Sequence, residues 1–192
     1  MTGMNAGLAE INSIAPAVAP PRLGATYSER ATLSDGTSVL LRPIRPADAP
    51  HLQDGLLRLS ERTRYLRFHA PRGAFSPDEL RTLTDVDGET HFALTAFTAR
   101  PQRLVAVGRF VRRTAAADDA EVALVVADGL QGRGLGELLL SRLREAALER
   151  NVTHFTGCIL DENRPMRGLL RKMGGRVGLA SRGVCNVDLP LT

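Results

Sequence analysis

The sequence predicts one α/β domain with a mixed sheet that is antiparallel in its first half and contains a β-α-β unit in its second. Two patterns support this fold class. An Asp-Gly pair at positions 35 and 36 separates two short apolar runs, which is typical of a β-hairpin. Further along, an aliphatic run at 121–127 leads through a glycine-rich loop into an amphipathic stretch at 137–150. The length of 192 residues, 43% of them hydrophobic, fits a single domain.

The first half begins with a segment, residues 1–25, that is rich in Ala, Pro and Gly and carries almost no charge. We expect a flexible leader there, with docking as a strand extension as the alternative, and a folded domain over residues 26–192. The hairpin then occupies residues 31–41. Two antiparallel strands are predicted at 91–98 and 104–112, on either side of a turn that contains proline.

Three helices are expected between the hairpin and these two strands. An acidic residue and a proline at 45–49 mark the start of the first helix, and the second covers about 61–68. The third begins at Ser76, because a serine followed by proline and, three positions on, by glutamate is a helix-capping pattern. It is expected to end near Leu83.

The second half contains the strand at 121–127, which is nearly all aliphatic and is therefore expected to be buried on both faces. The helix at 137–150 places Leu139, Leu143 and Ala147 on one apolar stripe. The remaining elements are predicted as a strand at 154–160, a short helix at 163–173 and a last strand at 184–189.

Composition excludes several classes of function. The single lysine, Lys172, stands between Arg171 and Met173, so the Gly-Lys-Ser/Thr of an ATP-binding P-loop is absent. Cys158 and Cys185 form no CxxC pair and the histidines are scattered, so we expect no metal site and two thiols buried in the core. No apolar run is long enough for a membrane span or a signal peptide, and we expect a cytoplasmic protein without a membrane partner.

Five arginines gather in one stretch of the first half, at positions 58, 62, 64, 67 and 72. We interpret them as a solvated helix face, with a basic surface for an acidic partner as the alternative. Aromatic residues make up only 4% of the chain and no nucleic-acid-binding motif is present, so no nucleic-acid partner is expected. Nothing in the sequence fixes the oligomeric state.

Gly132, Gly134 and Gly136 alternate in the loop that joins the aliphatic strand to the following helix. Glycines at such a junction let backbone N–H groups converge on an anion, and the positive end of the helix dipole adds to the attraction. The loop is therefore a candidate phosphate site, with an ordinary glycine-rich turn as the alternative. The dinucleotide fingerprint GxGxxG fits less well, because its last glycine falls on Glu137.

The stretch from Gln131 to Gly136, QGRGLG, resembles in full the Q/R-x-x-G-x-G/A hallmark of the GNAT superfamily of acyl-CoA-dependent N-acyltransferases. Its resemblance to the family extends from about residue 32 to residue 189. The chain looks most like the acetyltransferase domain of bacterial Pat-type protein lysine acetyltransferases, in runs at 35–36, 42–48, 59–68 and 120–123. The resemblance implies the GNAT fold, a mixed and mostly antiparallel central sheet flanked by helices, with a splayed strand pair that holds acyl-CoA.

The same resemblance implies a binding site for acetyl-CoA as co-substrate. Strand backbone groups would pair with the pantetheine arm and the thioester carbonyl, and loop amides would hold the pyrophosphate, since unpaired N–H groups stabilise an oxyanion. Arg133 would add charge beside the phosphates, whereas the carboxylate of Glu137 would have to point away from them. The residues so implied are Leu124, Val125, Val126, Gln131, Gly132, Arg133, Gly134, Leu135, Gly136, Glu137 and Asn163. For Asn163, helix capping is an equally good explanation.

Glu121 is the candidate catalytic residue. It lies ten positions before Gln131, where many members of the superfamily place a general base, and an ammonium substrate must lose a proton before its nitrogen attacks a thioester. We expect the aliphatic neighbours to desolvate its carboxylate in part, which raises its affinity for the proton. A surface ion pair with the nearby arginines is the alternative.

The general acid has no clear candidate. Where many members carry a tyrosine that reprotonates the CoA thiolate, this chain has Leu170, which leaves Cys158, Ser181, Tyr65 or water. The resulting prediction is an acetyl-CoA-dependent N-acetyltransferase that acts on protein lysines, with acyl-CoA synthetases as the protein substrates that the family implies. Acetylation of a small amine and an acyl-CoA-binding sensor without turnover are the alternatives.

Overall fold

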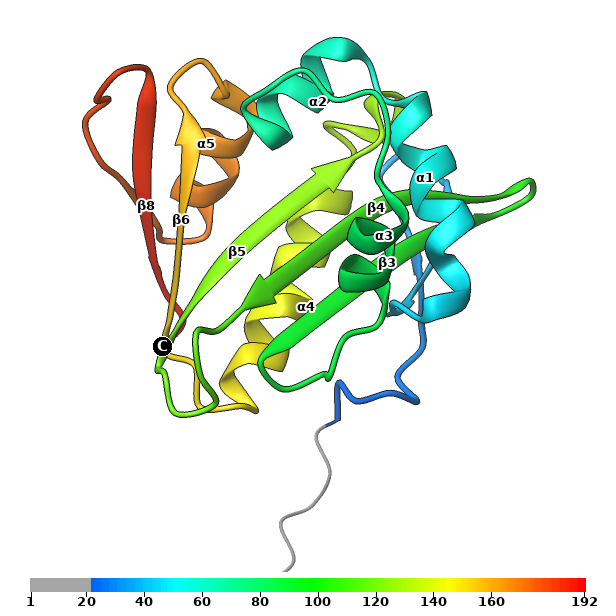
Figure 1. Ribbon diagram of the computed structural model, residues 1–192, viewed down its shortest axis with the longest axis horizontal. Coiled ribbons are helices and arrows are strands. Elements are labelled where there is room, and N and C mark those ends of the chain that lie inside the picture. The colour runs from blue at the N-terminus through cyan, green and yellow to red at the C-terminus, as the bar shows by residue number, and fades with distance from the viewer. Residues whose placement is uncertain (1–21) are drawn as a thin grey trace, which may run out of the picture.

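The computed structural model describes residues 22–192 and contains an eight-stranded mixed sheet in the order β1-β2-β3-β4-β5-β6-β8-β7 (Figure 1). The predicted leader lies outside the described residues up to position 21. Leu23, which the sequence analysis assigned to the leader, has no exposed surface and belongs to the main core. Packed structure therefore begins ahead of the hairpin.

The strands are β1 (Glu29–Thr32), β2 (Ser38–Pro43), β3 (His91–Ala99), β4 (Gln102–Val111), β5 (Asp119–Val126), β6 (His154–Leu160), β7 (Arg176–Val177) and β8 (Val184–Pro190). The helices are α1 (Ala49–Arg58), α2 (Glu61–Phe68), α3 (Pro77–Thr84), α4 (Leu135–Leu148) and α5 (Arg164–Lys172), with short 3-10 turns at Pro46–Asp48 and Asp128–Leu130. The predicted order is confirmed, and only the two-residue strand β7 has no counterpart in it.

The first half of the sheet is antiparallel, as predicted. The hairpin joins β1 to β2 through Gly36, whose φ of 85° is a conformation that glycine adopts without strain. Strand β3 pairs with β2 on one side and with β4 along its whole length on the other. The predicted capping pattern also forms, because Ser76 accepts from the N–H of Glu79 and the Glu79 carboxylate accepts from the N–H of Ser76.

Helices cover both faces of the sheet. Figure 1 shows α1 and α3 in front of β3 and β4, and α4 behind them. The larger core lies on the α4 side, where the predicted stripe of Leu139, Leu143 and Ala147 is fully buried. A smaller core lies under α1 and α3 and includes Leu52 and Phe97.

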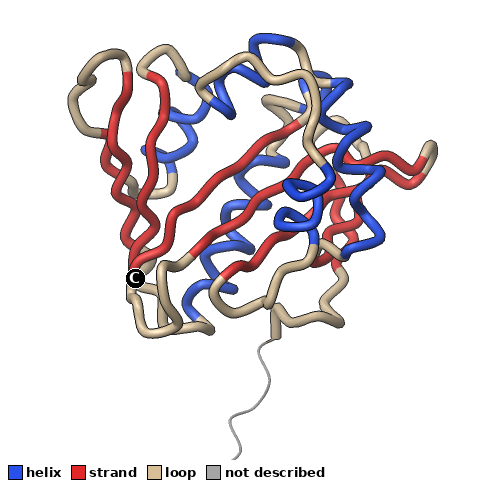
Figure 2. Tube along the Cα trace, viewed as in Figure 1, coloured by secondary structure: helices blue, strands red, loops and turns tan. Residues whose placement is uncertain are grey.

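The β-α-β unit runs from β5 through α4 to β6. The two strands are parallel, but they pair only over Asp119–Glu121 and His154–Thr156. Beyond that point they diverge like the arms of a V from a common point near the C-terminus (Figure 2), while β6 continues against β8. Helix α2 contacts both β5 and β6. The splayed strand pair is thus present between β5 and β6.

Two burial predictions are wrong. Strand β5 is not buried on both faces, because its residues from Ala123 to Val126 are half-exposed at the splay, where no strand covers one edge. Cys185 is buried as expected, but Cys158 is exposed. It lies on the same face of β6 as His154, which is also exposed, and its thiol donates to Asn186 Oδ1 at 3.4 Å.

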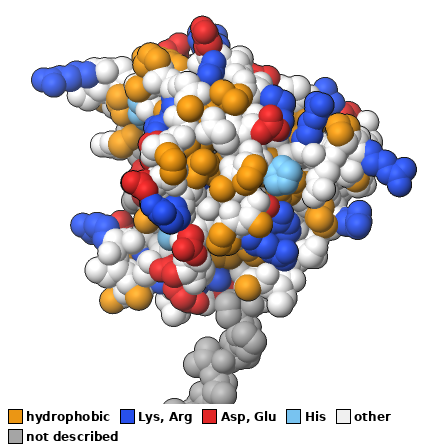
Figure 3. All heavy atoms as spheres, turned by 45° about the vertical axis from the view of Figure 1, so that its right-hand side comes forward, with side chains coloured by type: hydrophobic (Ala, Val, Ile, Leu, Met, Phe, Trp, Pro, Cys, Tyr) orange, Lys and Arg blue, Asp and Glu red, His pale blue; other side chains and the backbone are white. Residues whose placement is uncertain are grey.

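On the side of the molecule turned forward in Figure 3, basic and acidic side chains are interspersed around a group of hydrophobic ones. Across residues 22–192, none of the helices has the length and apolar character needed to cross a membrane.

Candidate active site

A cleft of about 400 Å³ opens where β5 and β6 separate. Four segments line it, namely α2, the end of β5, the glycine loop with the start of α4, and α5. The lining residues are Thr63, Leu66, Arg67, Leu124, Val125, Val126, Gln131, Gly132, Gly134, Gly136, Glu137, Asn163, Pro165, Met166 and Leu169. The structure thus brings together nine of the residues that the sequence analysis proposed for acetyl-CoA binding.

The edge of β5 offers backbone groups to this cleft. Ala127 N–H donates to Val105 O at 2.8 Å, so alternate residues of β5 bond to β4 and the residues between them face the opposite edge. Leu124 and Val126 therefore turn their backbone groups toward the splay, and Val126 O accepts from the Gln131 side chain at 3.0 Å. The backbone of Val125 instead faces β4, which corrects the expectation that all three residues present theirs to a ligand.

The glycine loop leaves the N-terminus of α4 open. Gly132 and Gly134 have φ values of 71° and 88°, Gly134 is the N-cap residue, and no side chain caps the helix. A Cβ at Gly136 would meet the side chains of Leu124, Val126 and Leu169 at 3.5–3.8 Å, all of them lining residues. Glycine at this position keeps the cleft open above free helix N–H groups, which is the arrangement that binds phosphate.

Two residues of the loop have other roles than the sequence suggested. Arg133 does not line the cleft; its side chain pairs with Asp35 in the hairpin turn, and its carbonyl accepts from the N–H of Ser34 at 3.4 Å. Leu135 is fully buried in the main core. Both side chains fix the loop against the rest of the domain, one on the hairpin and the other under the sheet.

The loop is also tied to α2. The Asp128 carboxylate accepts from Ser60 Oγ at 2.7 Å, from Thr63 Oγ1 at 2.6 Å and from the N–H of Ser60 at 2.9 Å. Burial raises the pKa of Asp128, but the hydrogen bonds from Thr63 and Ser60 outweigh it and hold the pKa below its usual value. Gln131 Nε2 adds a contact to Thr63 Oγ1 at 3.3 Å. Helix α2 is therefore fixed over the cleft.

Helix α5 closes the cleft from the other side. Asn163 lines the cleft and also caps the helix, because its Oδ1 accepts from the N–H of Met166 at 3.2 Å. Glu137 Oε2 lies 2.6 Å from Lys172 Nζ, so the carboxylate is paired with the last residue of α5. Leu170, which the family resemblance aligns with a tyrosine, is fully buried.

Glu121 lies outside the cleft lining, on the same strand. Its side chain is exposed, which corrects the expectation of partial desolvation. It shares its face of the sheet with Ala123 and Val125. Its charge acts on the half-buried Arg67, whose pKa is lowered by burial and by Arg72, while Glu121 opposes that shift. Glu121 thus interacts electrostatically with a guanidinium of α2 that lines the cleft.

Arg67 is an unexpected source of positive charge in the cleft. It lines the cleft, and no carboxylate lies within 4 Å of it among residues 22–192, so the interpretation of the arginines as one solvated face is wrong at this position. Behind it, Arg109 is only 6% exposed and donates to Leu83 O at 3.2 Å. Burial and the charge of Arg67 lower the pKa of Arg109 to about 10. The wall of the cleft nearest Glu121 is positively charged.

Sequence reasoning missed the contribution of two helices. The lining residues that it did not propose are Thr63, Leu66 and Arg67 from α2, and Pro165, Met166 and Leu169 from α5. The signal available for α2 was a helix carrying Leu66 and Phe68 but no apolar stripe, and the structure indeed buries none of its residues fully. The three side chains weighed as the acid, Cys158, Ser181 and Tyr65, are not among the lining residues.

The residues from 22 to 192 hold no cluster of His, Cys, Asp and Glu side chains suited to a metal ion. The open strand edge, the glycine loop beside it and the uncapped helix are the features from which the class of this protein is assigned. The chain matches the acetyltransferase (GNAT) domain model over residues 38–176 and belongs to that family.

Particular relatives narrow the comparison. The chain is 34% identical to acetyltransferase Pat of Mycolicibacterium smegmatis over 154 residues, which cover 78% of this chain and 45% of Pat. It is 32% identical to an acetyltransferase of Pseudomonas aeruginosa over 146 residues, 74% of this chain and 77% of that protein. The solved GNAT domain of S. lividans PAT superimposes with a TM-score of 0.81 at 28% identity, over 87% of this chain and 98% of that one. The chain thus spans under half the length of the first of these relatives.

Proposed function

We propose that the protein is an acetyl-CoA-dependent N-acetyltransferase that transfers the acetyl group directly to lysine side chains of other proteins. The open edge of β5 beside the uncapped N-terminus of α4 carries this proposal. It supplies strand donors for a thioester and a pantetheine arm, and helix N–H groups for phosphate, within one cleft.

The residues present fit acetyl-CoA. Half-exposed aliphatic side chains of β5 and α5 suit the pantetheine arm, and the loop glycines leave room for the pyrophosphate above the helix. Leu124, Val126, Gln131, Gly132, Gly134, Gly136 and Asn163 would hold the co-substrate. Glu137 does not oppose the phosphates, because Lys172 neutralises its charge. Acetyl-CoA supplies the activated acyl group, and no metal is needed for this chemistry.

In the proposed reaction the amine nitrogen attacks the thioester carbonyl carbon, a C–N bond forms, and the C–S bond breaks with its electron pair leaving on sulfur. Outward-facing N–H groups of β5 stabilise the developing oxyanion. Glu121 takes the proton of the amine. A strand rises about 3.3 Å per residue, so Glu121 lies roughly 10 Å along β5 from Leu124, and the proton passes through water.

The choice of a lysine acceptor rests on two observations. The chain is similar in sequence to Pat of M. smegmatis and in structure to the GNAT domain of S. lividans PAT. The side of the cleft at Glu121 is exposed, so a lysine on another protein can approach it without entering a closed pocket. Acyl-CoA synthetases are the proposed targets, on the resemblance to Pat-type enzymes, and the cytoplasm is the proposed compartment.

The test is transfer of a radiolabelled acetyl group to a panel of acyl-CoA synthetases and small amines, with wild type, Glu121→Gln and Asp119→Asn. Asp119 lies two residues before Glu121 on the same face of β5 and serves as the matched control. Glu121→Gln is expected to lower kcat by about 10²–10⁴-fold, the usual contribution of a general base, without weakening acetyl-CoA binding. Asp119→Asn is expected to retain wild-type kcat.

Three results would count against the proposal. Full kcat for Glu121→Gln at every pH would show that Glu121 is not the general base. Transfer to small amines alone would show that the acceptor is a small molecule rather than a protein. Binding of acetyl-CoA without transfer to any acceptor would favour an acyl-CoA sensor.

A further inference from the structure

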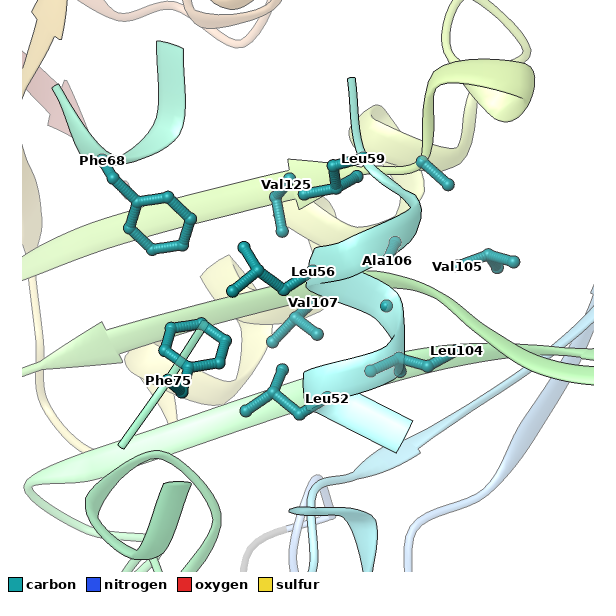
Figure 4. Close-up of a pocket in the computed structure, with 12 residues that line it drawn as sticks. Leu52, Leu56, Leu59, Phe68, Phe75, Leu104, Val105, Ala106, Val107 and Val125 are labelled. Carbon is teal, nitrogen blue, oxygen red and sulfur yellow. The ribbon is translucent and has the colours of Figure 1, made fainter. Parts of the chain in front are cut away.

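A second cavity, of about 50 Å³, lies on the α1 side of the sheet, between α1, the segment that follows α2, and strands β4 and β5. All the residues around it are apolar or glycine, and none offers a polar side chain. Figure 4 shows Phe68 and Phe75 at one end, Leu104 and Val105 at the other, and Leu52 and Leu56 of α1 reaching in between them. The remaining lining residues are Gly55, Leu59, Ala106, Val107, Val125 and Ala127.

Val125 lies between this cavity and the cleft, because it lines both of them. Its backbone is bonded to β4, and its side chain lies on the face of the sheet that α1 and α2 cover, beside Leu56 and Leu59 in Figure 4. Its neighbours Leu124 and Val126 present backbone groups to the open edge. If a thioester is held at that edge, only Val125 separates its carbonyl carbon from the cavity.

We propose that this cavity receives the hydrocarbon tail of acyl groups longer than acetyl, so that propionyl and butyryl thioesters are bound as well as acetyl-CoA. The inference rests on the proposed function, because it requires the thioester to lie along β5. A site for one water needs about 10–15 Å³, so a cavity of about 50 Å³ has room for about three to five groups of that size. That suits a tail of two or three carbons and excludes a long chain.

The charges around the cavity lie outside it. The Arg72 guanidinium stacks over the rings of Phe68 and Phe75 at 5.1 and 5.0 Å, and Arg67 over Phe68 at 5.0 Å. Neither arginine is among the residues that line the cavity. A tail ending in a carboxylate, such as succinyl, would lose its hydration there without gaining a partner.

Gly55 offers a way to fill the cavity with little disturbance. A Cβ there would lie 3.6 Å from Leu104 Cδ2, an ordinary contact, and both residues line the cavity. Gly168 in α5 is the matched control, because it is also a glycine within a helix and its Cβ would meet nothing within 4 Å. The same change to valine at both positions separates filling of the cavity from the effect of valine on a helix.

The experiment measures the Kd of CoA and of acetyl-, propionyl-, butyryl- and succinyl-CoA by isothermal titration calorimetry, and needs no acceptor. In wild type and Gly168→Val, each added methylene is expected to tighten binding by up to about fourfold from acetyl to butyryl, and succinyl-CoA to bind more weakly than butyryl-CoA. In Gly55→Val the gain from chain length is expected to disappear, with the Kd of acetyl-CoA changed less than about twofold. Phe75→Leu, which enlarges the cavity in a chain that keeps Gly55, is expected to extend the gain to chains longer than butyryl.

Equal binding of acetyl- and butyryl-CoA by wild type would overturn the inference while leaving the acetyltransferase proposal intact. So would tighter binding of succinyl-CoA than butyryl-CoA, or the same loss for all acyl chains in Gly55→Val. If wild type bound neither CoA nor acetyl-CoA, the proposed function would fail and this inference with it.

Discussion

The β3–β4 and β5–β6 junctions of the sheet are built in opposite ways. The register of β3 and β4 joins nine residue pairs, from His91 with Val111 to Ala99 with Gln102. That of β5 and β6 joins three and then ends. Both junctions are made from β-forming residues, yet one is closed by backbone hydrogen bonds and the other leaves an edge free for a ligand.

The contrast shows that an aliphatic strand is not necessarily a buried one. Open strand edges in proteins usually invite unwanted pairing and are blocked. Here α2 and α5 flank the open edge of β5, and the side chains of Gln131 and Asp128 hold the loop and α2 in place around it. The edge is thus accessible to a small ligand but shielded from another strand.

The largest effect is expected in the closed half, at the ion pair between Arg42 and Asp48. Both oxygens of Asp48 accept from Arg42 at 2.7 Å, one also accepts from the N–H of Arg45 at 2.8 Å, and Asp48 is 3% exposed. Asp48→Asn leaves the guanidinium without its counter-charge, so we expect the free energy of unfolding to fall by about 3 kcal/mol. Urea denaturation measures the change.

Asp78→Asn is the control for that experiment, because Asp78 forms an exposed pair with Arg81 on α3 and is expected to contribute nothing measurable. Acetyl-CoA affinity is expected to be unchanged in both variants under conditions where they are folded. An equal loss of stability in the two variants would show that the burial of Asp48 does not increase the contribution of its ion pair to the free energy of unfolding.

The second effect concerns the open half, at Gly134. Gly134→Asp places a side chain and a negative charge at the N-cap of α4, so we expect acetyl-CoA affinity to fall by at least about tenfold, the cost of 1.4 kcal/mol. Gly36→Asp is the matched control in the hairpin turn, since its φ of 85° is close to the 88° of Gly134 and neither Cβ would meet an atom within 4 Å.

Both glycine variants are expected to lose similar stability, because an L residue at positive φ costs about 1–2 kcal/mol. Only Gly134→Asp is expected to lose affinity in calorimetric titration. Unchanged acetyl-CoA affinity in Gly134→Asp would show that the loop does not bind the phosphates.

Much of the fold could be predicted from the sequence, because local signals and tertiary structure agree. The Asp35-Gly36 turn, the capping box of Ser76 and the stripe of Leu139 and Leu143 each act over a few residues and need no distant partner. The two-residue strand β7 could not, because within residues 22–192 it pairs with β8 alone and a run so short has no periodicity.

The candidate site divides in the same way. The loop glycines are readable because strand, loop and helix follow one another in the chain. The part played by Arg67 is not, because α2 reaches the cleft through the tether from Thr63 to Asp128, 65 positions away. The predictions that β5 and Cys158 are buried were wrong for a related reason. Hydrophobicity indicates that a strand favours burial, whereas the splay decides which neighbour is missing.

The smallest effect sharpens the comparison through pH, at His91 on β3 and His154 on β6. Burial lowers the pKa of His91 from 6.5 to about 4, with the charge of Arg109 adding to the shift and Asp87 opposing it. The unfolded chain therefore binds a proton that the folded chain does not, so this contribution is complete above pH 6.5 and is lost as the pH falls to 4. We expect about 1 kcal/mol, since the ring is only half-buried and solvent screens part of the shift.

His91→Gln is thus expected to flatten the dependence of unfolding free energy on pH between 6.5 and 4, as measured by urea denaturation at several pH values. His154→Gln is the control, because His154 is exposed beside the open junction and is expected to follow the wild-type curve. If the two variants gave the same curve, the closed junction would not be the part of the sheet that makes stability depend on pH. A flattened curve for His91→Gln alone would show that the closed junction lowers the unfolding free energy at low pH, because it buries part of a titratable ring beside a guanidinium. The open junction would then lack this effect.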